Sequence, residues 1–210
     1  YVSPGNVDSQ NIIVDPNESL NVSKDPVLII PKFNIDVPVV YKNTLGSTAQ
    51  ETYDLQMAAM KKGVAYFGAQ GFSAKPGQKG NFGLAGHSSN NFYDSGSAKF
   101  VFAPILKMKK GDIFYINYEG TRYTYSVKII KEVAPNDVNA LKIGTDKPMA
   151  TLITCTPLGT ADKRLLVFGE QISPSPENVQ KVQDDSSESG TKAQNFTGKT
   201  PSLLESLFGG

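Results

Sequence analysis

Residues 150–170 read ATLITCTPLGTADKRLLVFGE and decide the fold. They begin with an apolar run, residues 150–154, whose Leu, Ile and Thr content predicts a buried strand. Pro157 and Gly159 are residues that break strands and build loops. A second apolar run, residues 165–168, predicts a second strand. We therefore expect two strands joined by a short loop, whose facing ends share one rim if the strands are neighbours.

The side chains at the facing ends of these strands suit acyl transfer. Cys155, the only cysteine, ends the first strand, and Arg164 stands at the start of the second. His87 is the only histidine, so it is the only imidazole that could act as an acid or base near neutral pH. These three groups can carry acyl transfer through a thioester. Taken singly, a free cysteine is more often a small buried apolar residue.

Motifs around these residues resemble those of the sortase family. Leu152, Thr154 and Cys155 match the signature T-L-x-T-C, and Arg164 follows on the next strand, as in that family. Residues 83–87, GLAGH, are similar to the strand end that carries the family's histidine.

The resemblance implies a mainly β protein, a sortase-like eight-stranded β-barrel with one or two short helices. The sortase catalytic domain would occupy residues 26–172. Residues 1–25 are rich in polar residues and proline, and we expect an N-terminal arm or linker. Residues 173–210 have a similar polar composition and are expected to form a flexible C-terminal tail.

Residues 156–159, TPLG, and residues 164–167, RLLV, look most like the pilin-polymerising, class C-like branch of the family. Members of this branch carry a lid with an Asp-Pro-aromatic tip over the cysteine. Residues 15–17 and residues 25–27 contain Asp-Pro without the aromatic residue, so we do not expect a lid of that kind.

The resemblance also implies an activity, that of a cysteine transpeptidase. Cys155 would attack an LPxTG-like sorting signal after its Thr and form a thioacyl-enzyme. His87 would protonate the departing amine, and Arg164 would stabilise the oxyanion and position the substrate. Substrate contacts are expected at three further positions: Thr154, Leu152 and Ala85.

The implied partners are a surface protein or pilin with a C-terminal sorting signal and an amine acceptor, either a cell-wall precursor or a pilin lysine. The implied location is the extracellular face of the cell membrane, with an anchor outside this sequence. The chain begins with Tyr1, which leads us to expect a shortened or processed form. No cofactor and no metal are expected.

The composition limits the other functions that the chain could have. A chain of 210 residues fits one domain with extensions, and a net charge of +1 with mixed signs does not favour nucleic acid. One cysteine and one histidine exclude an internal disulfide and a thiolate metal cluster. Two alternatives stay open: a cysteine hydrolase of another family, and a non-catalytic cell-surface β-barrel binding module with Cys155 buried.

Local patterns predict further elements. Residues 27–41 predict two short strands separated by a break, and residues 52–62 predict a helix stopped by a glycine. Residues 81–87 form a Gly-rich strand, where close backbone approach could let a peptide lie against it. Residues 113–133 predict a hairpin with a two-residue turn, and residues 137–141 a short helix.

Overall fold

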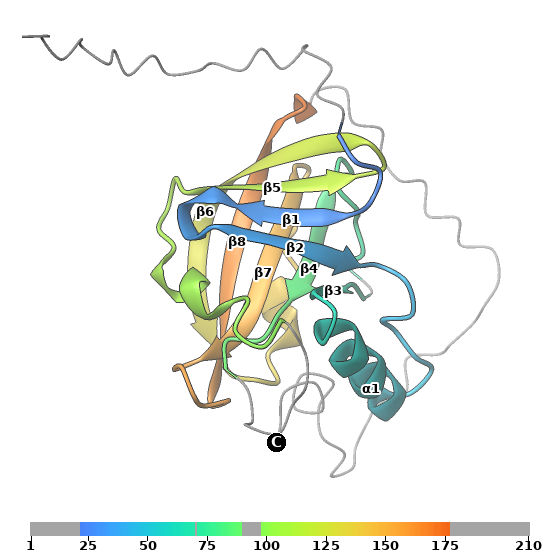
Figure 1. Cartoon of the computed structure of the whole chain (residues 1–210), viewed down its shortest axis with the longest axis vertical. Helices are drawn as coiled ribbons and strands as arrows, with labels where there is room; N and C mark the ends of the chain where they lie inside the picture. The colour runs from blue at the N-terminus through green and yellow to red at the C-terminus, as the bar shows by residue number, and fades with distance from the viewer. Residues whose placement is uncertain (1–21, 70, 90–97, 177–210) are drawn as a thin grey trace, which may run out of the picture.

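The computed structural model describes residues 22–69, 71–89 and 98–176, in which eight strands form a closed barrel with the order β1-β2-β3-β4-β7-β8-β6-β5 (Figure 1). The strands have these bounds: β1 (Val27–Ile30), β2 (Ile35–Val40), β3 (Val64–Phe67), β4 (Gly80–Ala85), β5 (Ile113–Tyr118), β6 (Thr121–Val133), β7 (Pro148–Thr156) and β8 (Lys163–Ser173). The predicted mainly β, eight-stranded barrel is confirmed. Most of the expected arm and tail lies outside the described residues.

Two of the neighbouring strand pairs are parallel, β2 with β3 and β4 with β7, and the others are antiparallel. Because β4 and β7 run in the same direction, their last residues meet at one end of the barrel. The strand β8 runs antiparallel to β7 and begins at that same end. The topology therefore gathers the ends of β4 and β7 and the start of β8.

The helical elements are short and lie between strands. The helix α1 (Ala49–Met60) begins three residues before the predicted start, because Thr48 caps it by accepting a hydrogen bond from the backbone N–H of Glu51. The 3-10 helices are η1 (Pro31–Phe33), η2 (Ala103–Lys107) and η3 (Val138–Leu141). Among the described residues, no helix has the length and apolar character needed to cross a bilayer.

The β5–β6 hairpin agrees with the prediction. Glu119 and Gly120 form the turn with φ angles of 52° and 80°, both in the left-handed region. Two-residue turns of this kind match the twist of the strands that they join. Since Gly120 has no side chain, it adopts this conformation without strain.

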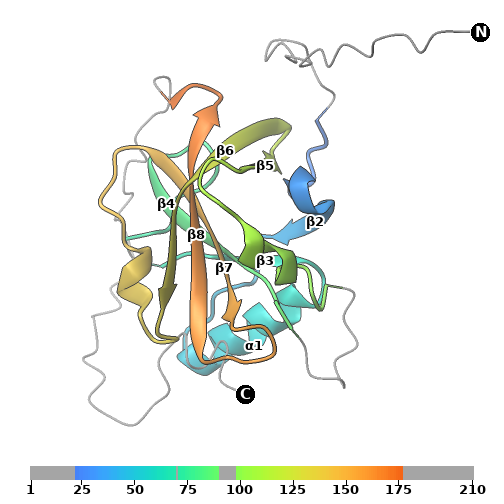
Figure 2. The same ribbon diagram turned by 90° about the vertical axis from the view of Figure 1, so that its left-hand side faces the viewer.

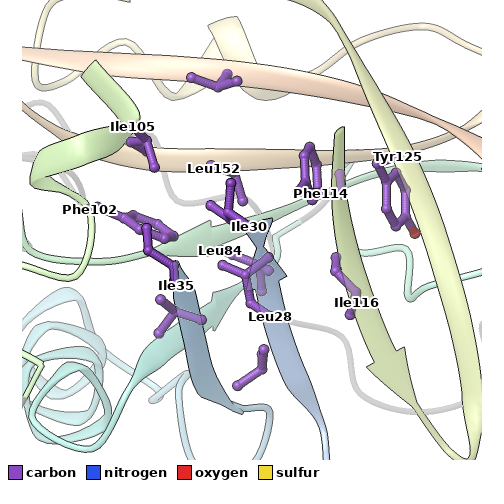
Figure 3. Packing of buried hydrophobic residues seen from close by; sticks show 14 of the residues in the cluster. Leu28, Ile30, Ile35, Leu84, Phe102, Ile105, Phe114, Ile116, Tyr125 and Leu152 are labelled. Atoms are coloured by element: carbon purple, nitrogen blue, oxygen red, sulfur yellow. The ribbon is translucent and has the colours of Figure 1, made fainter. Parts of the chain in front are cut away.

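One apolar cluster, here called the inner cluster, fills the barrel (Figure 3). Leu28 and Ile30 from β1 meet Leu84 from β4 and Leu152 from β7, and Phe102 packs among them. Each of these side chains is fully buried. Alternate residues of every strand point into this cluster, as expected for a filled barrel.

A second apolar cluster, here called the outer cluster, covers the outside of β4, β7 and β8. Met149, Ile153 and Leu166 belong to it, together with Met60 from α1 and Leu141 from η3. The helix α1 lies outside the barrel beside β3 (Figure 1). Because β7 and β8 are buried on both faces, their sequences are continuous apolar runs rather than alternating ones.

Candidate active site

The hairpin of β7 and β8 brings the thiol and the guanidinium together. Cys155 and Arg164 are directly opposed Cα partners in this antiparallel pair. Residues directly opposite each other on neighbouring strands project to the same face of a sheet. The geometry expected from the sequence, two side chains at one rim, is therefore present.

The parallel pairing of β4 with β7 brings the imidazole to the same level. Ala85 lies opposite Ile153, so two residues further along each strand His87 stands level with Cys155. The backbone N–H of Gly86 donates to the carbonyl of Ile153 over 3.1 Å, which continues the pairing beyond β4. The register thus places one residue from each of three adjacent segments in a row.

Two side-chain hydrogen bonds tie the histidine segment to β7. The hydroxyl of Thr154 donates to the carbonyl of Gly86 over 2.8 Å, and the hydroxyl of Ser88 donates to the carbonyl of Cys155 over 2.8 Å. These bonds lie on either side of His87. They hold its backbone against β7 although it lies outside the strand itself.

This row lies on the outer face of the barrel. Ile153 and Leu166 belong to the outer cluster, and Cys155 packs against it. Since Arg164 precedes Leu166 by two residues, strand alternation sends both side chains outward. We call His87, Cys155 and Arg164 the reactive row.

The reactive row is largely shielded from solvent. Arg164 is fully buried and His87 is 8% exposed, whereas Cys155 is only partly buried. Burial raises the pKa of the Cys155 thiol, and the charge of Arg164 opposes that shift without cancelling it. Desolvation is the larger of the two influences on this thiol, and the guanidinium acts in the direction that favours the thiolate.

The loop between β7 and β8 holds the guanidinium in place. One terminal nitrogen of Arg164, Nη1, donates to the carbonyls of Ala161 and Lys163 over 2.8 and 2.9 Å. Arginine can satisfy backbone carbonyls with one edge of its planar fork while its other nitrogens face elsewhere. The loop thereby fixes the charge beside Cys155.

The three residues expected to contact substrate are all buried in this structure. Leu152 is fully buried in the inner cluster, and Ala85 is buried in the outer cluster. Thr154 is fully buried, and its hydroxyl binds the carbonyl of Gly86 rather than a group in a cleft. The Thr154 bond holds the backbone next to His87 in place.

The glycines of the histidine segment serve internal packing. A Cβ on Gly83 would lie 2.6 Å from Cδ1 of Ile153, and one on Gly86 would lie 2.7 Å from the ring of Phe102. The close approach expected of this Gly-rich strand is present at Gly83, where the side chain of Ile153 occupies the space. Phe102 also donates its backbone N–H to the carbonyl of His87 over 2.8 Å.

Local sequence patterns missed Ser88 and Phe102 as supports of the site. Ser88 directly follows His87, and this adjacency was the only available signal. Phe102 is separated from His87 by residues outside the described part of the chain. Within residues 22–69, 71–89 and 98–176, no group of three or more His, Cys, Asp or Glu side chains could hold a metal ion.

The comparisons with known proteins agree with this architecture. A family model described as the sortase domain matches residues 28–172. Sortase A of Streptococcus agalactiae serotype III (strain NEM316) is 28% identical over 170 residues, which cover 81% of this chain and 62% of that relative.

Two solved structures are similar to the chain at the level of both fold and sequence. Sortase C from Clostridium perfringens SM101 is 32% identical with a TM-score of 0.52, covering 72% of this chain and 73% of that one. The pilus-related sortase C of Group B Streptococcus is 29% identical with a TM-score of 0.56, covering 73% and 70%. Because the family model spans well over half of the sequence, the chain belongs to the sortase family.

Proposed function

We propose that this protein is a sortase-type cysteine transpeptidase that cleaves an LPxTG-like sorting signal after its Thr and transfers the acyl group to an amine. The observation that carries the proposal is the register that sets His87, Cys155 and Arg164 level on three neighbouring segments. Such a row offers a nucleophile, a proton carrier and a fixed cation to one carbonyl group.

The first half of the proposed reaction forms a thioester. Burial raises the pKa of Cys155, which favours the thiol, and in this proposal a base removes its proton. His87 takes the thiol proton while the sulfur attacks the carbonyl carbon of the Thr residue. The oxyanion that forms is stabilised by the charge of Arg164. The imidazolium of His87 then gives its proton to the leaving nitrogen as the C–N bond breaks.

The second half transfers the acyl group to an amine. The nitrogen of the acceptor attacks the thioester carbonyl, and neutral His87 takes a proton from that nitrogen. The C–S bond breaks, an amide forms, and the imidazolium returns its proton to the sulfur of Cys155. Water in place of the amine would give a free carboxylic acid.

The substrate in this proposal is a surface protein or pilin, and the reaction occurs at the extracellular face of the cell membrane. Cell-wall precursors and pilin lysines both supply suitable amines. The similarity to sortase C structures, one of them described as pilus-related, supports the pilin lysine as an acceptor to test first.

Product analysis by mass spectrometry tests the proposal. The protein is mixed with a panel of LPxTG-like peptides, with and without an added amine such as a short lysine-containing peptide. We expect cleavage after Thr and an amide product whose yield rises with the amine. Cleavage that yields only the free acid at every amine concentration would favour the cysteine hydrolase instead. Intact peptides together with an unreactive thiol would favour a binding module.

A further inference from the structure

We infer that Asn81 and Thr151 are positioning residues. They hold the β3–β4 connection and the β6–β7 connection, which flank the outer face, in the shape that binds the substrate peptide. The inference rests on the proposed function. Asn81 lies on β4 and Thr151 on β7, and neither residue belongs to the reactive row.

The two residues form a buried hydrogen-bond network. The hydroxyl of Thr151 donates to Oδ1 of Asn81 over 2.8 Å, and Nδ2 of Asn81 donates to the carbonyl of Leu141 over 2.9 Å. The backbone carbonyl of Asn81 accepts from the N–H of Ala74 over 3.1 Å. Asn81, Thr151 and Leu141 are all fully buried. One asparagine thus binds two separate connections.

The bonds of Asn81 reach the β3–β4 connection at Ala74 and the β6–β7 connection at Leu141. These connections also approach each other, because a Cβ on Gly71 would lie 3.5 Å from Cγ of Lys142. Gly71 has a φ of +91°, a conformation that favours glycine. The network therefore lies where the two connections meet.

Both connections contribute apolar side chains to the surface that carries Cys155. Phe72 and Leu141 belong to the outer cluster, and Val138 and Ile143 pack against it while partly exposed, as does Cys155 itself. On β7, Thr151 precedes Cys155 by four residues, a span of about 13 Å along an extended strand. Because Thr151 and Ile153 are themselves buried, a peptide whose carbonyl reaches Cys155 would meet the partly exposed Val138 and Ile143 of the β6–β7 connection rather than β7 itself.

Buried polar groups keep a fixed geometry when each has a partner, and they are costly when a partner is lost. Removing the Thr151 hydroxyl leaves Oδ1 of Asn81 without its donor and frees the amide to rotate. The bond to Leu141 then weakens, and η3 loses its fixed distance from β4. The expected consequence is weaker peptide binding with unchanged chemistry at Cys155.

The central variant is Thr151→Val, which keeps the shape and removes the hydroxyl, with Thr151→Ser as the matched control. We expect Thr151→Val to raise KM for an LPxTG-like peptide by about 3- to 10-fold, the order that one hydrogen bond carries. In Thr151→Val, kcat and the rate of Cys155 alkylation by iodoacetamide should stay within about 2-fold of wild type. In Thr151→Ser, KM, kcat and the alkylation rate should all stay close to wild type.

Amide hydrogen exchange at residues 139–143 provides a readout that needs no substrate. Exchange there is expected to accelerate in Thr151→Val and in Asn81→Asp, which keeps an acceptor for Thr151 but loses the donor to Leu141. If the wild type processes no peptide, the proposed function fails while exchange still tests the network. Unchanged exchange, or a fall in kcat and alkylation at unchanged KM, would overturn the inference.

Discussion

The two faces of β7 place the same kinds of residue in different roles. Leu152 and Thr154 point toward the barrel interior. Leu152 packs in the inner cluster there, and the Thr154 hydroxyl donates to the carbonyl of Gly86. Ile153 and Cys155 belong to the outer face, where the apolar cover ends beside a partly exposed sulfur. The comparison teaches that the inner cluster determines whether the barrel forms, whereas the edge of the outer cluster determines which groups can react.

The largest expected effect comes from removing the nucleophile. Cys155→Ala should abolish thioester formation and transfer, because no other cysteine exists in the chain. The thermal midpoint should change little, since the side chain is small and only partly buried. The assay is product formation by mass spectrometry, with a melting curve for each protein. Transfer that survives at a wild-type rate would exclude the proposed reaction.

The next largest effect is expected for Arg164→Lys. Lysine keeps the charge but not the planar fork that binds the carbonyls of Ala161 and Lys163. We expect kcat/KM to fall by a factor on the order of 10²–10³, typical of a lost transition-state donor. Arg122→Lys is the matched control, because Arg122 binds Asn117 on the β5–β6 hairpin at the other end of the barrel. Equal losses in both variants would argue against a special role for the reactive row.

Substitutions at two adjacent residues of β7 test whether its inner and outer faces have different roles. Leu152→Ala and Ile153→Ala should each lower the free energy of unfolding by about 2–5 kcal/mol, because both side chains are fully buried. Only Ile153→Ala should also lower kcat/KM several-fold, since Ile153 packs in the outer cluster beside Cys155. Denaturant unfolding and peptide-cleavage kinetics measure the two quantities. The same kinetic loss in Leu152→Ala would show that the faces are not separate.

The smallest expected effect is a shift in pH dependence. Arg164 lowers the pKa of Cys155 against the larger effect of burial. Loss of the positive charge in Arg164→Gln should therefore move the midpoint of iodoacetamide alkylation to higher pH. Alkylation rates across a pH series measure the midpoint, and Arg122→Gln serves as the control. A midpoint that stays in place or moves to lower pH would contradict the assignment of this charge to the thiol.

Much of the barrel could be predicted from the sequence because its signals are local. The turn at Glu119 and Gly120 and the apolar run before Cys155 each depend on a few adjacent residues. The apolar pattern places the start of α1 too late because the helix cap, Thr48, lies before that pattern begins.

The supports of the site could not be predicted because they depend on register between distant segments. The hydrogen bond from Ser88 to Cys155 and the fit of Ile153 against Gly83 exist only when β4 and β7 are aligned. The raised pKa of Cys155 likewise depends on how deeply the hairpin is covered. Figure 2 shows β7 and β8 running together to the turn that joins them. Their antiparallel pairing sets Cys155 opposite Arg164.

The central claim is that Cys155 carries the acyl group on the outer face of the barrel. The most direct measurement is mass spectrometry of the protein quenched in acid shortly after mixing with an LPxTG-like peptide, followed by peptide mapping. The account predicts an adduct of the N-terminal peptide fragment on Cys155 that disappears when an amine is added, with the matching amide appearing. Cleavage of the peptide by the same sample with no acyl adduct on Cys155 at any time point would contradict it.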